Sequence, residues 1–393
     1  MKIDTRLAER LKKINPSSTL AITSKAKKLK SEGKDIVTFA AGEPDFDTPA
    51  FIKDAACEAI RSGFTKYTPT TGIPELKKLI CQKFKKDNSL EYAPGQVIVS
   101  CGAKHSIYNA LMVLVNKADE VLIPLPYWVS YPEMVSLCEG IPRFIKTSPE
   151  NNFKITVTDL KKHITPKTKV LILNSPSNPA GSVYSRLELE EIAKVCVSKN
   201  IFVISDEIYE KIIFDGQKHE SIASFNKDIY DLTVTVNGLS KSHSMTGWRI
   251  GYLGAPNDVA NAISNLQDHS TSNPNSIAQK AAVAALSASD DFAFESCRKF
   301  QERRDYLASR LSKIGRISFT MPQGAFYMFC NISKTGLGSM EFARRLLEEE
   351  FVSVIPGVSF GMDDYIRISF ATGIEEIGKG MDRLEKWLEE ISK

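Results

Sequence analysis

Short runs of apolar residues alternate with longer segments of helical periodicity in the part of the chain between residues 97 and 237. The apolar runs lie at residues 97–100, 120–123, 170–174, 202–205 and 233–236. Short buried runs separated by helical segments are typical of βαβ units. The pattern therefore predicts an α/β fold with a doubly wound, largely parallel sheet.

The pattern changes after about residue 290, where long amphipathic segments are interrupted by short apolar runs. It predicts helices at residues 292–314 and 375–391, and strands at 324–329, 352–355 and 365–370. Long helices with a few short strands indicate a separate α+β unit.

A chain of 393 residues is longer than one hydrophobic core usually fills, so we expect two domains. We predict a large domain at residues 50–290, and a small domain formed by residues 1–49 together with residues 291–393. The segment before residue 50 is rich in lysine. We expect it to pack against the small domain or against a partner subunit.

Composition excludes several classes of protein. The 51 basic and 47 acidic residues are interspersed, which gives no support for nucleic-acid binding. The seven cysteines include no CxxC pair, and a reducing cytoplasm is the simplest location for them. The start of the chain lacks the apolar segment of a signal peptide, and no run reaches the roughly 18 apolar residues of a membrane span. The five histidines are scattered, so we expect no metal site.

Polar residues and glycines follow the predicted strands. They occur at residues 102–104, 126–128, 178–179, 206–209 and 237–249. In open α/β sheets, ligands bind outside the carboxyl ends of the strands. We therefore expect these segments to form one site.

The segment after the last predicted strand carries Lys241 and, eight residues later, Arg249. A lysine amine forms a Schiff base with a carbonyl and moves protons, and an arginine offers a charged, bidentate contact to a phosphate. Small residues such as Ser240 leave room for a ring and supply hydroxyl donors. This pattern fits pyridoxal 5′-phosphate (PLP), although a surface loop would give the same short motif.

Five motifs in this order and spacing resemble those of the class I aminotransferases of PLP-dependent fold type I. They are Asn178-Pro179-x-Gly181, Asp206-Glu207-x-Tyr209, Ser240-Lys241, Gly247-x-Arg249-x-Gly251 and a late Arg367. The chain is most similar to the prokaryotic-type aspartate aminotransferase branch, at residues 42–46, 126–132 and 236–238. The resemblance implies a large domain with a mostly parallel seven-stranded sheet, a smaller α+β domain and a homodimer with shared active sites.

The resemblance also implies roles around the cofactor ring. Lys241 would carry the reactive amine, and Asp206 would meet the pyridine nitrogen. Asn178 and Tyr209 would bond the ring oxygen, while Trp128 would stack on the ring; Asn178 and Trp128 would also face the substrate. From the residues alone, Asp206 could instead be a helix N-cap and Trp128 an ordinary core residue.

A second set of residues would hold the phosphate. The resemblance assigns this role to Gly102, Ala103 and Lys104, which follow a predicted strand and precede a helical segment, and to Arg249. Backbone N–H groups at such a helix start suit an anion. Tyr67 is similar to the tyrosine that the neighbouring subunit contributes to the phosphate.

The resemblance makes Arg367 the clamp for the substrate α-carboxylate, together with the backbone of Gly42. Asp268 stands where the animal and enterobacterial type has an arginine for the distal carboxylate, and in this branch Lys104 with Thr19 takes that role. Arg367 could otherwise face solvent, and Lys104 could be a phosphate ligand or a solvated lysine.

The function implied is transfer of an amino group from aspartate to 2-oxoglutarate, with ping-pong kinetics. Partners would be small amino acids and 2-oxo acids. A bifunctional aspartate/prephenate aminotransferase, and an aromatic or alanine aminotransferase of the same fold, remain alternatives. A regulator that uses this domain as a ligand sensor is disfavoured, because the roughly 40 residues before Gly42 do not resemble a DNA-binding module.

Overall fold

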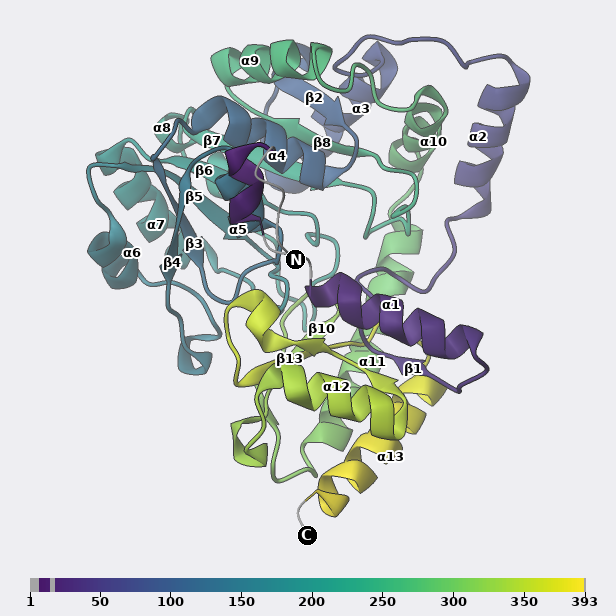
Figure 1. The fold of residues 1–393 in the computed structure, drawn as a ribbon. Coiled ribbons are helices and arrows are strands. Elements are labelled where there is room, and N and C mark those ends of the chain that lie inside the picture. Colours follow the sequence, from purple (N-terminus) through teal and green to yellow (C-terminus); the bar gives the residue numbers. More distant parts are fainter. Residues whose placement is uncertain (1–6, 15–17, 392–393) are drawn as a thin grey trace.

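The computed structural model describes residues 7–14 and 18–391, with residues 18–21 described by their backbone. Figure 1 shows a larger part, which is built around a seven-stranded sheet, above a smaller part that contains both α1 and the C-terminal helices. None of the described helices is both long and apolar enough to cross a membrane.

The large sheet has the strand order β2-β8-β7-β6-β5-β3-β4. Every neighbouring pair is parallel except the two that involve β8, which runs antiparallel to β2 and to β7. The prediction of a largely parallel seven-stranded sheet is confirmed. The strands are β2 (Val97–Ser100), β3 (Glu120–Pro124), β4 (Ile141–Ile145), β5 (Thr168–Asn174), β6 (Phe202–Asp206), β7 (Thr233–Gly238) and β8 (Gly251–Gly254).

Helices cover both faces of this sheet. Val121 and Ile123 pack with α4, α5 and α9, whereas Leu122 between them packs with α6 and α7 on the opposite face. Because both faces are buried, the central strands are continuous apolar runs. The helices are α2 (Ala50–Arg61), α3 (Pro74–Asn88), α4 (Ala103–Leu114), α5 (Tyr131–Leu137), α6 (Val157–His163), α7 (Arg186–Lys199), α8 (Lys227–Tyr230), α9 (Asn257–Asp268) and α10 (Ser276–Ser287).

Two strands of this sheet were not predicted from the sequence. The strand β4 lies at the sheet edge, and several of its residues are exposed, so it lacks a buried apolar run. The strand β8 has only four residues, and two of them are glycines. Neither pattern differs from that of a loop.

The smaller part contains a four-stranded sheet in the order β12-β13-β10-β9, with antiparallel pairs throughout. The run predicted as one strand at residues 352–355 is divided between two sheets, because β11 pairs with β1 and β12 pairs with β13. The elements are α1 (Ser18–Ser31), β1 (Val37–Thr38), α11 (Asp291–Leu311), β9 (Ser318–Phe319), β10 (Tyr327–Asn331), α12 (Ser339–Glu350), β11 (Val352–Ser353), β12 (Ile355–Pro356), β13 (Tyr365–Ser369) and α13 (Ile374–Glu390).

The N-terminal segment packs on the C-terminal elements, since α1 contacts α12 and β1 pairs in parallel with β11. The core of the smaller part also includes Ile208, Tyr209 and Phe214, which follow β6 of the large sheet. The apolar core is therefore continuous across the two parts. The domain boundaries at residues 49/50 and 290/291 stay a prediction.

Gly380 allows α13 to lie close against β1. A Cβ atom at this position would stand 2.4 Å from Phe39 Cζ and 2.9 Å from Val37 Cγ1. We expect Gly380→Ala to lower the free energy of unfolding by about 1–3 kcal/mol, the usual cost of overpacking. The matched control is Gly378→Ala, whose Cβ would meet only the movable Tyr306 hydroxyl at 3.0 Å and should gain up to about 1 kcal/mol from helix propensity. Equal stabilisation of both variants in urea denaturation would contradict this packing.

Candidate active site

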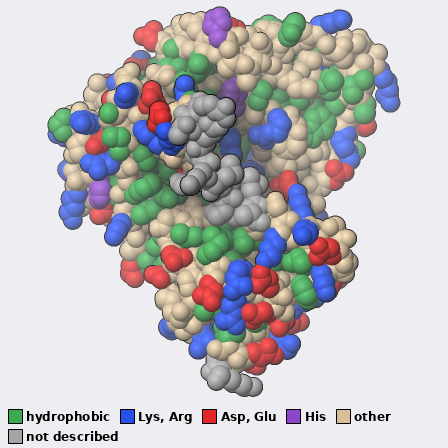
Figure 2. All heavy atoms as spheres, in the orientation of Figure 1, with side chains coloured by type: hydrophobic (Ala, Val, Ile, Leu, Met, Phe, Trp, Pro, Cys, Tyr) green, Lys and Arg blue, Asp and Glu red, His purple; other side chains and the backbone are tan. Residues whose placement is uncertain are grey.

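A cavity of about 390 Å³ lies where β5, β6 and β7 end, and residues of both parts of the molecule line it. In Figure 2 the surface facing the viewer is hollowed between the upper and lower parts. The predicted site residues that line the cavity are Gly42, Ala103, Lys104, Trp128, Asn178, Asp206, Tyr209, Ser240, Lys241, Arg249 and Arg367. The fold thus brings most of the predicted site into one cavity.

Asp206 is the last residue of β6, and its carboxylate is buried. Its Oδ2 accepts a hydrogen bond of 2.6 Å from the Tyr131 hydroxyl, and its Oδ1 accepts one of 3.3 Å from the Ile208 N–H. Burial raises the pKa of Asp206 to about 6, although the Tyr131 hydrogen bond opposes this shift. The residues directly after Asp206 form a turn and not a helix, so the N-cap interpretation does not apply.

Lys241 follows β7, and its Nζ donates a hydrogen bond of 2.5 Å to the carbonyl oxygen of Gly42. Nζ lies 5.7 Å from the ring centre of Tyr209 and 5.8 Å from that of Phe326. Desolvation lowers the pKa of Lys241 to about 8, and the nearby carboxylate of Glu43 partly offsets it. An amine with this pKa is suited to exchange protons near neutral pH.

Arg367 points into the protein from β13, so it is not a solvent-facing arginine. Its Nη1 donates to Asn178 Oδ1 at 3.0 Å, and its Nη2 donates to the carbonyl of Ala40 at 3.1 Å. The guanidinium carbon lies 4.2 Å from the ring centre of Tyr327. The Nε of Arg367 is buried without a hydrogen-bond partner, which leaves a donor for a ligand.

Tyr209 contacts a tyrosine of the smaller part. Its hydroxyl forms a hydrogen bond of 2.8 Å with the hydroxyl of Tyr327 from β10. Burial and the neighbouring Tyr327 raise the pKa of Tyr209, which keeps its phenol protonated. Tyr209 and Asn178 both line the cavity, so both are positioned to donate to a ligand.

Arg249 lies opposite the start of α4. Its Nη1 donates to the carbonyl of Thr246 at 2.8 Å, and its Nη2 approaches the carbonyl of Cys101 at 3.4 Å. Gly102 has a φ of +92°, and a Cβ atom there would stand 2.3 Å from the Nη2 of Arg249. The absence of that atom lets the guanidinium lie against the N-terminus of α4 at Ala103, where backbone donors and a cation meet.

Lys104 lies on the first turn of α4, with Nζ 4.8 Å from the ring centre of Trp128. Desolvation, with a smaller contribution from Arg249, lowers the pKa of Lys104. Within residues 7–14 and 18–391, no carboxylate forms an ion pair with it. Lys104 is therefore available to an acidic ligand.

Two predicted residues of the described part, Tyr67 and Gly102, do not line the cavity. The side chain of Tyr67 is 93% exposed. The backbone of Thr19 belongs to α1, but its side chain lies outside the described part. Gly102 borders the cavity only through its contact with Arg249.

Tyr131, Tyr327 and Glu43 line the cavity but were not predicted as site residues. Tyr131 and Glu43 lie within motifs that the sequence did indicate, at residues 126–132 and 42–46. Tyr327 lies in a continuous buried strand that carries no polar signal.

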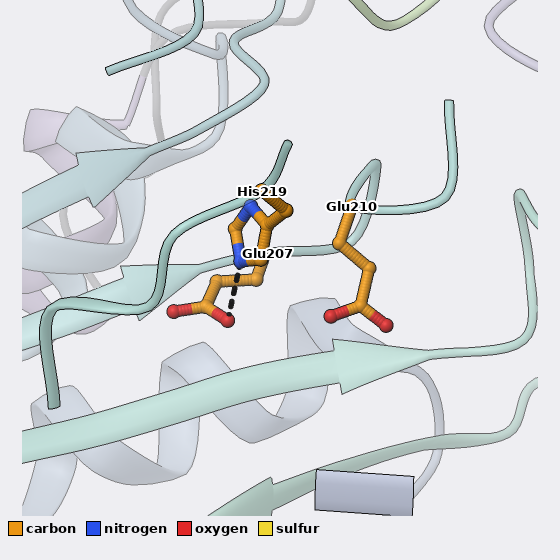
Figure 3. Close-up of side chains that lie close together, drawn as sticks. All are labelled: Glu207, Glu210 and His219. Atoms are coloured by element: carbon orange, nitrogen blue, oxygen red, sulfur yellow. Dashed lines mark hydrogen bonds and ion pairs between the residues drawn. The ribbon is translucent and has the colours of Figure 1, made fainter. Parts of the chain in front are cut away.

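Glu207, Glu210 and His219 form a buried cluster behind the site, with ligand atoms within 4.8 Å of one another. Figure 3 shows His219 facing Glu207, to which its Nε2 is hydrogen-bonded at 2.8 Å. The amide of Asn88 donates to Glu207 at 2.9 Å and to Glu210 at 2.7 Å, and Lys83 forms an ion pair with Glu210. Nδ1 of His219 is buried without a partner, but the carboxylates of Glu207 and Glu210 are already paired with His219, Asn88 and Lys83, so we assign the cluster to support of the turn after β6.

The pKa of Asp206 gives a prediction about stability without a bound ligand. The carboxyl pKa is about 6 in the folded chain and 3.8 ordinarily, so ionisation penalises the folded state as the pH rises from about 4 to about 6. We expect Asp206→Asn to raise the free energy of unfolding by about 1–3 kcal/mol above pH 6, with a smaller gain at pH 4. Chemical denaturation at several pH values measures this, and a gain independent of pH would contradict it.

Comparison with known proteins agrees with this geometry. The family model described as aminotransferase class I and II matches residues 34–384. The chain is 49% identical to an aspartate aminotransferase of Bacillus sp. (strain YM-2), over 97% of this chain and 99% of that protein. It is 44% identical to an aspartate/prephenate aminotransferase of Nitrosomonas europaea, over 98% of this chain and 100% of that protein.

Among solved structures, the aspartate aminotransferase of Thermus thermophilus with maleate has a TM-score of 0.93 and 39% identity, over 97% of this chain and 99% of that one. Similarity of this extent covers both parts of the molecule and the cavity between them. The chain therefore belongs to the class I and II aminotransferase family, whose cofactor is pyridoxal 5′-phosphate.

Proposed function

We propose that the chain is an aspartate aminotransferase, which converts L-aspartate and 2-oxoglutarate to oxaloacetate and L-glutamate. The observation that carries the proposal is that Lys104 and Arg367 line the same cavity as Lys241, and neither forms an ion pair with a described carboxylate. Two unpaired cations beside a reactive amine suit a substrate with two carboxylates. The relative from Thermus thermophilus was solved with maleate, which is a dicarboxylate.

The cavity residues fit the cofactor. The buried carboxylate of Asp206 suits a protonated ring nitrogen, and the flat indole of Trp128 suits the ring face. The guanidinium of Arg249, which lies against the backbone N–H groups at the start of α4, suits the phosphate. When bound, PLP supplies an electron sink for the bond broken at Cα and carries the amino group between the two substrates.

Lys241 is the proton carrier in this proposal. Its pKa of about 8 leaves a substantial fraction of the amine neutral near physiological pH. Its Nζ would accept the proton from Cα of aspartate in the first half of the reaction. In the second half it would donate a proton to Cα of the glutamate that forms from 2-oxoglutarate. In this structure the amine is held in the cavity by a hydrogen bond to the carbonyl of Gly42.

Arg367 binds the α-carboxylate of the substrate. Its contacts with Asn178 and Ala40 fix the plane of the guanidinium, so little rotamer entropy is lost on binding. This fixes the orientation of Cα relative to Lys241.

Lys104 takes the distal carboxylate, with help from Thr19. Asp268 is exposed at the end of α9 and does not line the cavity, so it adds no negative charge there within this chain. The same arrangement supports a second activity on prephenate, a compound with two carboxylates, as in the relative from Nitrosomonas europaea.

We also propose a homodimer in which Tyr67 reaches the phosphate of the partner's cavity. A tyrosine that is 93% exposed on one chain supports this, because aromatic side chains are enriched at interfaces.

All seven cysteines are free, which supports a location in a reducing cytoplasm. A role in amino-acid biosynthesis fits this location.

Loss of the Lys241 amine should affect turnover and not folding. We expect Lys241→Ala to lower kcat by about 10²–10⁴-fold, the range typical of general acid–base catalysis. Single-turnover kinetics with aspartate measure this, and thermal melting serves as the control for folding. Turnover within a few-fold of the wild type would exclude Lys241 as the proton carrier.

The role of Lys104 is testable by comparing substrates. We expect Lys104→Met to lower kcat/KM for aspartate by about 10–100-fold, because a charged hydrogen bond contributes roughly 1.5–3 kcal/mol. The value for alanine, which has no distal carboxylate, should change little. Rates with prephenate and glutamate on the same two proteins show whether the second activity uses the same cation. An equal loss for aspartate and alanine would mean that Lys104 serves the cofactor instead.

A further inference from the structure

Arg249 lies at the end of a loop, residues 244–249, whose backbone is constrained at both ends. Ser244 has a φ of +52° and Arg249 a φ of +55°, although neither is a glycine. Such residues persist in the left-handed region only where the surroundings hold them. The position of the arginine therefore depends on contacts from outside the loop.

The hydroxyl of Thr48 supplies two such contacts. It donates a hydrogen bond of 2.7 Å to the carbonyl of Ser244 and accepts one of 3.0 Å from Nε1 of Trp248. Thr48 is 7% exposed, so water does not readily replace either bond. A single buried hydroxyl thus ties together both ends of the loop.

Glu43, five residues before Thr48, provides a second attachment to the loop. Its Oε2 accepts a hydrogen bond of 2.8 Å from the Thr246 hydroxyl, and the Thr246 carbonyl accepts one of 2.8 Å from Arg249 Nη1. Residues 42–48 therefore contact the loop at its start, middle and end.

Residues 42–48 are themselves anchored on the other side, against α11. Arg303 donates two hydrogen bonds to the carboxylate of Asp45, at 2.7 and 2.9 Å. The ring of Phe46 packs against that of Phe300, with centroids 5.2 Å apart. A bidentate ion pair and an aromatic contact give Thr48 a fixed base from which to hold the loop.

We propose that Thr48 is a positioning residue for Arg249, and through it for the phosphate of the cofactor. Thr48 does not line the cavity, so it acts only through the loop. The inference rests on the proposed contact between Arg249 and the phosphate. It predicts that loss of the Thr48 hydroxyl weakens binding of the phosphate group specifically, and leaves the contacts of the ring unchanged.

The test compares PLP with pyridoxal, which lacks the phosphate, in equilibrium dialysis with the cofactor-free protein. We expect Thr48→Val, which keeps the shape and removes the hydroxyl, to raise the Kd for PLP by about tenfold, the effect of one charge-assisted hydrogen bond. The Kd for pyridoxal should change by less than about twofold. Thr48→Ser, which keeps the hydroxyl, should restore most of the PLP affinity.

Arg249→Lys separates this inference from the proposed function. A loss of PLP affinity without a loss of pyridoxal affinity supports the phosphate contact of Arg249, and an equal loss of both overturns it. If Arg249→Lys lowers the affinity for PLP but not for pyridoxal, and Thr48→Val shows no such selective loss, the positioning role of Thr48 is wrong while the phosphate contact of Arg249 stands. In the double variant, Thr48→Val should cost less than it does alone, because its effect passes through Arg249.

Trp248→Phe covers the case in which Thr48→Val does not fold. It keeps an aromatic ring, and it removes the N–H that donates to Thr48 together with part of the indole. We expect the same selective loss of PLP affinity, at a smaller size. Unchanged PLP binding in this variant, with wild-type thermal melting, would overturn the inference.

Discussion

Four cationic side chains line one cavity, and none of them forms an ion pair with a described carboxylate. The rest of the site depends on this excess of unpaired positive charge. They are Lys104, Lys241, Arg249 and Arg367. Desolvation lowers the pKa values of Lys104, Lys241 and Arg367, whereas it raises that of Asp206. Each shift favours the neutral form of the side chain, as expected for a buried charge that lacks an ionic partner. A cofactor with a phosphate, and a substrate with carboxylates, would supply the partners.

The sheet makes this arrangement possible. Parallel strands place Asn174 and Asp206 at one edge, and the turn after β7 adds Lys241. The smaller part closes the other side with Arg367 from β13 and Tyr327 from β10. Because the core is continuous from one part to the other, the residues that follow β6 belong to the site and to the packing of the smaller part at once. Changes in that packing therefore reach the cavity directly.

The sequence was informative wherever the local pattern of apolar and polar residues decides the secondary structure. The strands β2, β3, β5, β6 and β7 were predicted because both of their faces are buried, and Asp206 and Lys241 were found because they follow such strands. The sequence was uninformative where contacts between distant segments of the chain decide the structure. The hydrogen bond between Tyr209 and Tyr327 joins residues 118 positions apart, and the contacts of Thr48 reach 196 and 200 positions along the chain. The inward direction of Arg367 also depends on its pairing opposite Phe329. All five residues of β13 are buried, so no alternation of buried and exposed positions in the strand reveals this direction.

The close approach of Gly102 and Arg249 has a consequence for how such a sequence can change over time. A side chain at position 102 and the guanidinium at position 249 would occupy the same space. A side chain at position 102 would displace the guanidinium of Arg249 from the start of α4 and would strain the backbone at a φ of +92°, whereas a smaller residue at position 249 would leave Gly102 undisturbed. In a set of related sequences, a residue other than glycine at position 102 should therefore occur mainly where position 249 is no longer arginine, although the two positions lie far apart in the chain.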